Sequence, residues 1–265
     1  MIAFSDLHKA FEDNPVLKGF TLDVHDGETM VIIGYSGTGK SVALKHVVGL
    51  LEPDSGHVEV DGQIVSELRR PELTALRATI GYVFQFAALF DSLTVFENVA
   101  LGLRRLQALS ETAIAERVRE SLKLVDLPRA EQHMPPELSG GMRKRVGLAR
   151  AIALRPKYIL YDEPTTGLDP VTSAVIDQLI VRTREALGVT SIVITHDMRT
   201  AYTVGDRIAM LYQGKVQQVG PVEEIKGTAD PVVRQFIEGR PDGRAVVRAS
   251  LGDAGRAAAL EGEET

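Results

Sequence analysis

The chain has 265 residues, of which 44% are hydrophobic and 25% are charged. This composition is typical of soluble globular proteins and excludes collagen-like, coiled-coil and largely disordered chains, and the length predicts one or two domains. The formal net charge of −6 does not favour a polyanion such as nucleic acid, and the absence of cysteine excludes disulfides, thiolate zinc sites and cysteine nucleophiles.

Residues 1–6 lack the basic start and the apolar stretch of a secretory signal. Apolar runs elsewhere, such as 31–33 and 151–154, are much shorter than the roughly 20 residues that a membrane-spanning helix needs. We therefore expect a cytoplasmic protein whose contact with any membrane is peripheral.

Strand-like runs alternate with helical patterns along the chain, which is typical of an α/β protein. Three early runs lie beside turn signals such as Asp26-Gly27 and Asp61-Gly62 and predict an antiparallel edge; they are residues 2–5, 20–24 and 57–60. Four short, uncharged runs predict the buried strands of a parallel sheet; they are residues 29–33, 80–84, 158–161 and 191–195. Residues 207–219, with a turn at Gly214, predict a late hairpin.

A long stretch without strand signals, about residues 86–155, predicts an inserted helical subdomain. Within it, Thr94 and Glu97 have the spacing of a capping box at a helix N-terminus. Four apolar residues at helical spacing predict the buried face of a later helix; they are Ile114, Val118, Leu122 and Val125. Residues 240–265 are mainly Gly, Ala, Arg and acidic residues, so we expect a flexible C-terminal tail.

The sequence GYSGTGKS, from Gly34 to Ser41, matches the phosphate-binding loop pattern directly after a predicted strand and before a helix. Glycines let successive backbone N–H groups point at a phosphate, and the helix N-terminus adds positive potential. Lys40 supplies a full charge to the β- and γ-phosphates, and Ser41 supplies a ligand for Mg²⁺. The alternative is a glycine-rich turn without a ligand. The predicted phosphate-binding residues are Gly34, Ser36, Gly37, Thr38, Gly39, Lys40 and Ser41.

Two carboxylates, Asp162 and Glu163, follow the apolar run 158–161. Solvated acids at a strand end are the alternative interpretation. Beside a phosphate-binding loop, however, Asp162 is placed to hold magnesium through water, and Glu163 is placed to activate the attacking water as a general base. Charge neutralisation and water positioning are the requirements of phosphoryl transfer.

A second anion site is predicted where the tetrapeptide LSGG, residues 138–141, leads into a helix over 142–154. With this motif the chain resembles the ATP-binding cassette (ABC) family over about residues 1–238. The resemblance implies an α/β fold: a P-loop NTPase (RecA-like) core with an antiparallel β subdomain and the inserted helical subdomain, together forming one ATP-binding domain over 1–239. It also implies ATP and Mg²⁺ as ligands, and a second copy of the chain whose Ser139, Gly140 and Gly141 face the bound phosphates.

The same resemblance assigns four further residues by their place between the motifs. Phe11 corresponds to the aromatic that stacks on adenine, although alone it is equally consistent with a core aromatic. Gln85 corresponds to the lid glutamine that senses magnesium and the γ-phosphate, and Asp169 to the aspartate that contacts the second subunit. His196 corresponds to the switch histidine, which hydrogen-bonds the γ-phosphate and orients water. The resemblance thus implies Glu163, His196, Lys40 and Gln85 as catalytic residues, and Ser41, Gln85 and Asp162 as metal ligands.

Other polar residues have simpler interpretations. Five histidines have no metal-ligand spacing, and we expect ordinary surface or helix positions for them; they are His8, His25, His46, His57 and His133. The basic run 143–145, Arg-Lys-Arg, is consistent with a nucleic-acid patch, but three charges on one helix more often form a solvated face near a phosphate site.

Met142 replaces the glutamine that usually ends the signature motif. Together with residues 84–95 and 230–239, this departure resembles the ATPase subunit of MCE-type phospholipid transporters, the Mla system. That subfamily moves lipid between the bacterial inner and outer membranes. The resemblance implies a membrane permease, a periplasmic MCE-domain protein and often a STAS-domain regulator as partners. It also implies a location on the inner face of the inner membrane, and a C-terminal extension that contacts the partner ATPase subunit; a free chain end is the alternative.

Two other functions remain open at this point. One is the ATPase subunit of an importer for a polar solute such as an amino acid. The other is a non-transport cassette protein that acts on DNA or ribosomes, which the single cassette and the acidic net charge disfavour. The apolar residues at 86–90 and Leu93 suggest a groove for a permease helix, or else simple packing of the helical subdomain.

Overall fold

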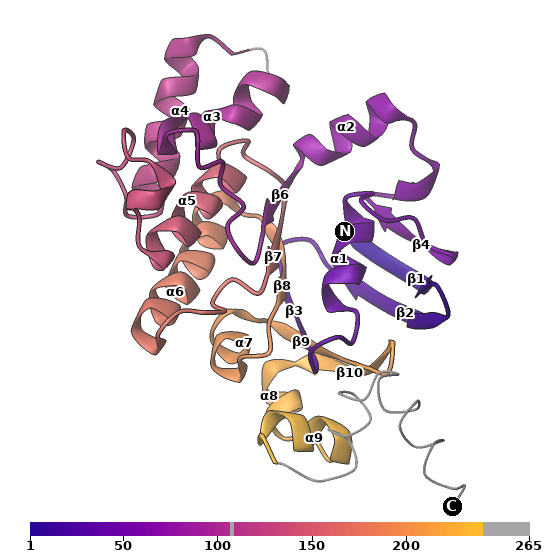
Figure 1. Ribbon diagram of the computed structural model, residues 1–265. Coiled ribbons are helices and arrows are strands. Elements are labelled where there is room, and N and C mark those ends of the chain that lie inside the picture. The colour runs from indigo at the N-terminus through magenta and orange to yellow at the C-terminus, as the bar shows by residue number, and fades with distance from the viewer. Residues whose placement is uncertain (107–108, 241–265) are drawn as a thin grey trace, which may run out of the picture.

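Two β-sheets, with helices between and outside them, make up the computed structural model, which describes residues 1–106 and 109–240 (Figure 1). Within these residues the larger sheet has six strands in the order β10-β9-β3-β8-β7-β6. They are β3 (Thr29–Ile33), β6 (Ile80–Val83), β7 (Tyr158–Asp162), β8 (Thr190–Ile194), β9 (Arg207–Tyr212) and β10 (Lys215–Pro221). Strands β9 to β6 run parallel, and β10 pairs antiparallel with β9. The predicted parallel strands and the late hairpin are confirmed.

The early strands form a second, antiparallel sheet in the order β2-β1-β4-β5. They are β1 (Ile2–Phe11), β2 (Asn14–Val24), β4 (Ser55–Val60) and β5 (Gln63–Ile64). The predicted antiparallel pairing is confirmed. Its placement as an edge is wrong, because β1 pairs with β2 and β4 rather than with a strand of the larger sheet. Strands β1 and β2 also extend beyond the predicted runs, since polar residues such as His8 and Lys18 occupy paired positions outside the apolar stretch.

The helices lie on both sides of the larger sheet. They are α1 (Lys40–Val47), α2 (Arg70–Ala78), α3 (Val95–Leu106), α4 (Glu111–Leu124), α5 (Gly140–Ile152), α6 (Pro170–Leu187), α7 (Met198–Val204), α8 (Val222–Lys226) and α9 (Pro231–Ile237), with short 3₁₀ turns η1 (Val65–Glu67) and η2 (Pro135–Glu137). Helices α3, α4 and α5 fill the stretch 86–155, whose described residues contain no strand. None of the helices that the structure describes is long and apolar enough to cross a membrane.

The capping box at the start of α3 is confirmed. The Thr94 hydroxyl accepts from the Glu97 N–H at 3.2 Å, and the Glu97 carboxylate accepts from the Thr94 N–H at 2.8 Å. The predicted tail, residues 240–265, lies outside the described residues except for Arg240.

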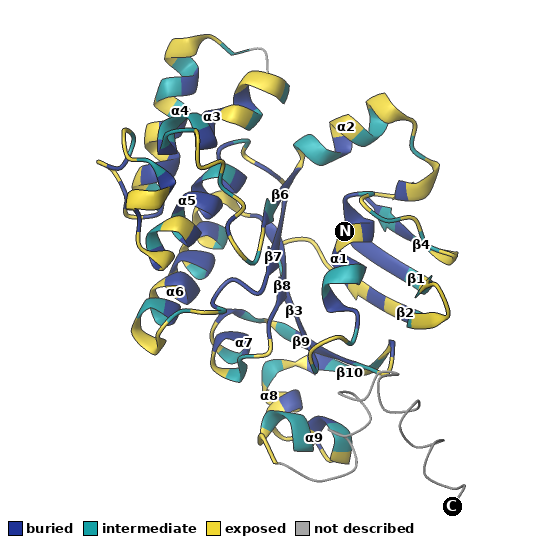
Figure 2. Cartoon of the chain, in the orientation of Figure 1, coloured by how far each residue is buried: buried dark blue, intermediate teal, exposed yellow. Residues whose placement is uncertain are grey.

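The central strands β3, β7 and β8 are buried along their whole length on both faces of the larger sheet, which explains why they are almost continuously apolar (Figure 2). One core lies between this sheet and helices α3 to α6, and the predicted apolar face of α4 is buried there. The other core lies between the two sheets, around α1. Alternate residues of β7 divide between them: Ile159 and Tyr161 enter the first core, and Tyr158 and Leu160 enter the second.

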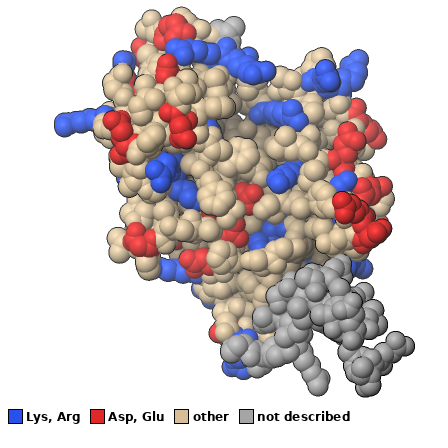
Figure 3. Space-filling view, in the orientation of Figure 1, with Lys and Arg blue, Asp and Glu red and all other residues tan. Residues whose placement is uncertain are grey.

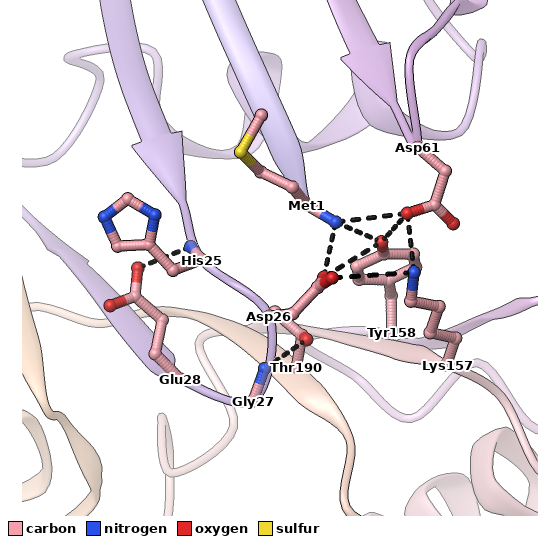
Figure 4. A network of polar contacts seen from close by, with 9 residues as sticks. All are labelled: Met1, His25, Asp26, Gly27, Glu28, Asp61, Lys157, Tyr158 and Thr190. Carbon is pink, nitrogen blue, oxygen red and sulfur yellow. Dashed lines mark hydrogen bonds and ion pairs between the residues drawn. The ribbon is translucent and has the colours of Figure 1, made fainter.

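A polar junction joins the two sheets where β4 meets the start of β7 (Figure 4). The Asp61 carboxylate accepts from the Lys157 ammonium at 2.6 Å and from the Tyr158 hydroxyl at 2.5 Å, and the amino group of Met1 also contacts it. Although burial opposes the shift, these donors lower the pKa of Asp61 to about 2. The junction thereby fixes the smaller sheet against the strand that ends in Asp162.

Candidate active site

A cleft of about 520 Å³ opens where the loop after β3 meets the ends of β7 and β8. It brings together residues far apart in the sequence, and predicted site residues make up most of its lining. The lining residues are Phe11, Val16, Ser36, Gly37, Gly39, Lys40, Ser41, Val42, Gln85, Glu163, Thr166 and His196. Ligands commonly bind at the carboxyl ends of parallel strands, so the position agrees with the predicted ligand site.

Two glycines permit the sharp curl of the loop between β3 and α1. Gly34 has φ of 152°, and a Cβ there would lie 2.4 Å from the backbone oxygen of Leu211. Gly39 has φ of 100°, and its Cβ would lie 2.7 Å from a methyl group of Val16. Both positions therefore require glycine, and the curl leads directly into the N-terminus of α1.

Lys40 folds back over this loop. Its ammonium donates to the backbone oxygens of Gly34 at 2.7 Å and Tyr35 at 3.0 Å. Burial lowers the pKa of Lys40, while the nearby carboxylates of Glu163 and Asp162 oppose that shift. A partly desolvated cation on a glycine-rich loop is a strong attractor for phosphate oxygens.

The Asp162 carboxylate, at the end of β7, accepts hydrogen bonds from two hydroxyl groups. Ser41 on α1 donates to its Oδ1 at 2.7 Å, and Tyr82 on β6 donates to its Oδ2 at 3.3 Å. The contact with Ser41 brings together the two residues predicted to share a metal. The contact with Tyr82 was not predicted, because it depends on the pairing of β6 with β7.

Glu163 and His196 form a pair at the bottom of the cleft. His196 Nδ1 lies 2.8 Å from Glu163 Oε2, and the Thr166 hydroxyl donates to the same oxygen at 3.0 Å. Glu163 has a left-handed φ of 50°, and its N–H donates to the Ile194 carbonyl, which anchors it to the adjacent strand. A non-glycine residue in this region is characteristic of functional sites.

Lys144 was expected on a solvated face, and this prediction is wrong. Its side chain is buried, at 8% exposed, and its ammonium donates to the backbone oxygens of Gln85 and Glu163. Arg150, on the same helix α5, donates to the backbone oxygens of Ala87 and Ala88, both at 2.7 Å. The sequence signal that identifies Lys144 is its spacing from the buried residues Gly147 and Leu148, which puts it on the packed face of α5.

The predicted signature residues lie outside the cleft lining of their own chain. Ser139 and Gly140 are exposed, and the Ser139 hydroxyl caps α5 by accepting from the Met142 N–H at 3.2 Å. Gly141 is buried, and a Cβ there would lie 2.5 Å from the Thr172 methyl group of α6. Asp169 is exposed and caps α6, accepting from the Thr172 N–H at 3.0 Å. The loops of Ser139 and Asp169 are therefore both exposed, and Gly141 packs against the first turn of α6.

Phe11 follows the pattern of a ligand contact rather than that of a core aromatic. Its side chain is 43% exposed and lines the cleft, and the Lys9 ammonium lies 5.8 Å from the centre of its ring. An exposed aromatic beside a phosphate-binding loop is available for stacking on a planar base.

A family model described as ABC transporter matches residues 17–166. The chain belongs to the ABC transporter family. A solved structure supports the assignment: the ATP-binding cassette MJ0796, in a dimeric post-hydrolysis state bound to ADP and Pi, aligns with a TM-score of 0.77 and 36% identity. The alignment covers 84% of this ABC ATPase and 99% of that chain. The predicted P-loop NTPase fold and ATP hydrolysis are thereby confirmed.

The names of relatives of this ABC ATPase state different transported substrates. The probable ribonucleotide transport ATP-binding protein mkl of Mycobacterium leprae is 42% identical over 90% of this chain and 69% of its own length. The intermembrane phospholipid transport system ATP-binding protein MlaF of Haemophilus influenzae is 40% identical, over 87% and 88% respectively. The methionine import ATP-binding protein MetN of Carboxydothermus hydrogenoformans is 42% identical, over 82% and 64%. The comparisons agree on a transporter ATPase and differ on its substrate.

Proposed function

We propose that the chain binds ATP with Mg²⁺ in the cleft, closes around it with a second copy, and powers phospholipid transport between the bacterial inner and outer membranes. The observation that carries the ATPase part is the convergence of Lys40, Ser41, Glu163 and His196 in one cleft. Asp162 joins them through its hydrogen bond with Ser41. The similarity to MlaF over nearly its whole length supports the lipid part.

The phosphate-binding loop is proposed to hold the triphosphate. Ser36, Gly37 and Gly39 of this loop line the cleft, and backbone N–H groups of such a curled loop are suited to phosphate oxygens. The Lys40 ammonium, which now satisfies two loop carbonyls, has a third hydrogen for the β- and γ-phosphate oxygens. Phe11 at the cleft mouth is proposed to stack on adenine.

The residues fit a magnesium ion. Mg²⁺ prefers hard oxygen ligands such as hydroxyl, carboxylate and amide groups. The Ser41 hydroxyl and the Asp162 carboxylate already lie 2.7 Å apart, and the Gln85 side chain lines the same cleft. When bound, the metal neutralises charge on the β- and γ-phosphates. These three residues are therefore the proposed metal ligands, with Asp162 acting through water.

Glu163 is the proposed general base. Its carboxylate is largely buried and lies at the cleft floor, where it can accept the proton of the attacking water. His196, 2.8 Å from it, is proposed to orient that water and to contact the γ-phosphate. Lys40 and Gln85 complete the proposed catalytic set by stabilising charge on the phosphate that is transferred.

A second copy of the chain is the proposed partner for the exposed loops of Ser139, Gly140 and Asp169. These loops carry a helix N-terminus and backbone N–H groups, yet they do not reach the cleft of their own chain. A two-fold arrangement, in which each signature loop covers the nucleotide of the other copy, satisfies both sites at once. The dimeric state of the MJ0796 cassette supports this arrangement.

A permease helix is the proposed occupant of a second cavity, of about 660 Å³, between α2, β6, α3 and α5. Its apolar lining includes Phe84, Ala88, Phe90, Leu101 and Leu154. Figure 3 shows Lys and Arg side chains on both sides of this hollow, and Asp and Glu side chains over the smaller sheet. Phe90 is 52% exposed there, whereas Ala87 and Leu89 pack inward, so the predicted groove holds only part of the predicted apolar run.

The wider assembly follows from the similarity to MlaF. We propose a location on the cytoplasmic face of the inner membrane, with the permease connecting the chain to a periplasmic MCE-domain protein, and a STAS-domain protein as regulator. An importer for a polar solute is the second candidate, because MetN is as similar in identity over most of this chain. The predicted contact between residues 240–265 and the partner subunit concerns residues that, apart from Arg240, lie outside the described part of the chain.

The experiment that separates the two candidates uses the complex of this chain with its permease in lipid vesicles. ATP-dependent transfer of a fluorescent phospholipid, without uptake of radiolabelled methionine, is expected. The matched control is the same complex carrying Glu163→Gln, which should transfer neither. Methionine uptake that requires an intact Glu163 would overturn the lipid assignment while leaving the ATPase assignment in place.

A further inference from the structure

Tyr82 belongs to two sites at once. Its hydroxyl donates to Asp162 Oδ2 at 3.3 Å in the nucleotide cleft, while its ring lines the second cavity. There the ring stacks on Phe84, with centroids 4.3 Å apart and planes 28° apart. Among the hydrogen bonds that the structure describes, this is a direct side-chain link between a residue of the cavity wall and a proposed metal ligand.

Strand pairing explains why Tyr82 reaches Asp162. Strand β6 lies at the edge of the larger sheet and pairs in parallel with β7, placing Tyr82 opposite Leu160. Alternate residues of a strand share a face, so Asp162 lies on the same face as Leu160 and one step further along. That face packs on α1, which carries Ser41. The register thus brings the hydroxyls of Tyr82 and Ser41 to the same carboxylate.

The two hydroxyls have different roles if Ser41 is a metal ligand, as proposed above. The Ser41 oxygen would then hold the metal through a lone pair, while its hydrogen is still available to Oδ1. Tyr82 comes from the opposite side, from β6, and its bond to Oδ2 does not compete with the metal. A carboxylate that keeps one fixed donor loses less side-chain freedom when it takes up its position toward the metal.

We infer that Tyr82 is a positioning residue that orients Asp162 for magnesium. It also couples the orientation of Asp162 to whether the cavity beside Phe84 is occupied. This inference rests on the proposed function of both sites. A helix in the cavity packs on the Tyr82 and Phe84 rings and restricts their motion, so the hydroxyl stays on Asp162 for a larger fraction of the time.

The first test measures how binding of a fluorescent ATP analogue to the full chain depends on magnesium concentration. Tyr82→Phe keeps the ring and removes only the hydroxyl, and it is expected to raise the magnesium concentration for half-saturation about three- to tenfold. Binding in the presence of EDTA and the melting temperature of the free chain should not change. The matched control is Tyr161→Phe, which removes a buried hydroxyl that has no hydrogen-bond partner in the described structure.

The second test uses the complex with the permease. Phe84→Ala leaves the Tyr82 hydroxyl in place, so it should keep the magnesium dependence of the isolated chain and lower the stimulation of ATPase activity by the permease. Tyr82→Phe should raise the magnesium concentration for half-saturation and also lower the stimulation by the permease. If wild-type binding depends on magnesium but Tyr82→Phe matches Tyr161→Phe, the inference is overturned. If wild-type chain shows no magnesium-dependent binding at all, the proposed function itself fails.

Discussion

The Lys144 ammonium lies 3.2 Å from the backbone oxygen of Glu163 and also donates to the backbone oxygen of Gln85. One buried cation on α5 therefore connects the segment of the proposed general base, Glu163, with the segment of the proposed lid glutamine, Gln85. The same helix begins at the exposed loop of Ser139, so α5 connects that loop with both segments.

Replacing Lys144 with Met removes both hydrogen bonds and keeps most of the apolar stem. We expect kcat for ATP hydrolysis to fall about tenfold, since bonds to a charged group are worth about 1.5–3 kcal/mol and the base loses its anchor. ATP affinity, measured with a fluorescent analogue, should change little because Lys144 does not line the cleft. Arg145→Met is the control, because the Arg145 guanidinium donates to the backbone oxygen of Asp126, outside the cleft lining. A kcat within twofold of wild type would show that the hydrogen bonds of Lys144 do not contribute to ATP hydrolysis.

Glu163→Gln tests the proposed base. The amide keeps the size of the side chain but cannot accept the proton of water, so turnover should fall by about 10²- to 10⁴-fold while ATP still binds. Closed pairs should then accumulate with ATP and magnesium, which light scattering detects as a doubling of the mass. The double variant with Lys40→Ala and Glu163→Gln should remain monomeric under the same conditions. Near-normal phosphate release by Glu163→Gln would exclude Glu163 as the base.

Phe90→Asp tests the second cavity as the permease site. The substitution puts a charge among apolar lining residues, and we expect stimulation of ATPase activity by the permease to be lost while basal activity is kept. Phe86→Asp is the matched control, because Phe86 is 84% exposed on the same loop and does not line the cavity. Equal stimulation of both variants would contradict docking at this cavity.

The parts of the fold that the sequence predicts well are those in which local pattern and tertiary role agree. Strands of a sheet buried on both faces must be apolar throughout, so β3 and β7 are recognisable without their neighbours. The phosphate-binding loop is equally local, because Gly34 and Gly39 are required by backbone shape and close approach within a short segment.

The parts that sequence analysis missed depend on pairing between distant segments. The early strands carry antiparallel signals, but only the pairing of β1 with β4 shows that they form a sheet of their own. Tyr82 meets Asp162 because of the register of β6 on β7. Lys144 has the same charge as its exposed neighbour Arg143, and only the packing of α5 separates a buried anchor from a solvated side chain.

A buried carboxyl group provides a prediction about pH. Asp177 on α6 is 2% exposed, its Oδ1 has no hydrogen-bond partner in the described structure, and burial raises its pKa to about 6 despite the nearby Thr200 hydroxyl. An unfolded Asp has a pKa of about 3.9. The folded chain therefore holds this proton more tightly than the unfolded chain, and the free energy of unfolding decreases as pH rises from about 4 to about 6.

Asp177→Asn should remove this dependence. Above pH 6 the wild-type chain carries a charge in an apolar setting, which costs at most about 3 kcal/mol for a shift of about two units. The amide is neutral at every pH, so the variant should be more stable than wild type at pH 8, by about 1–3 kcal/mol, and nearly equal to it at pH 4. Urea unfolding at the two pH values measures the difference, with the exposed Asp13→Asn as the control for loss of one charge. If Asp177→Asn changes stability equally at pH 4 and pH 8, the carboxyl group does not titrate with folding, and the stabilisation has another origin.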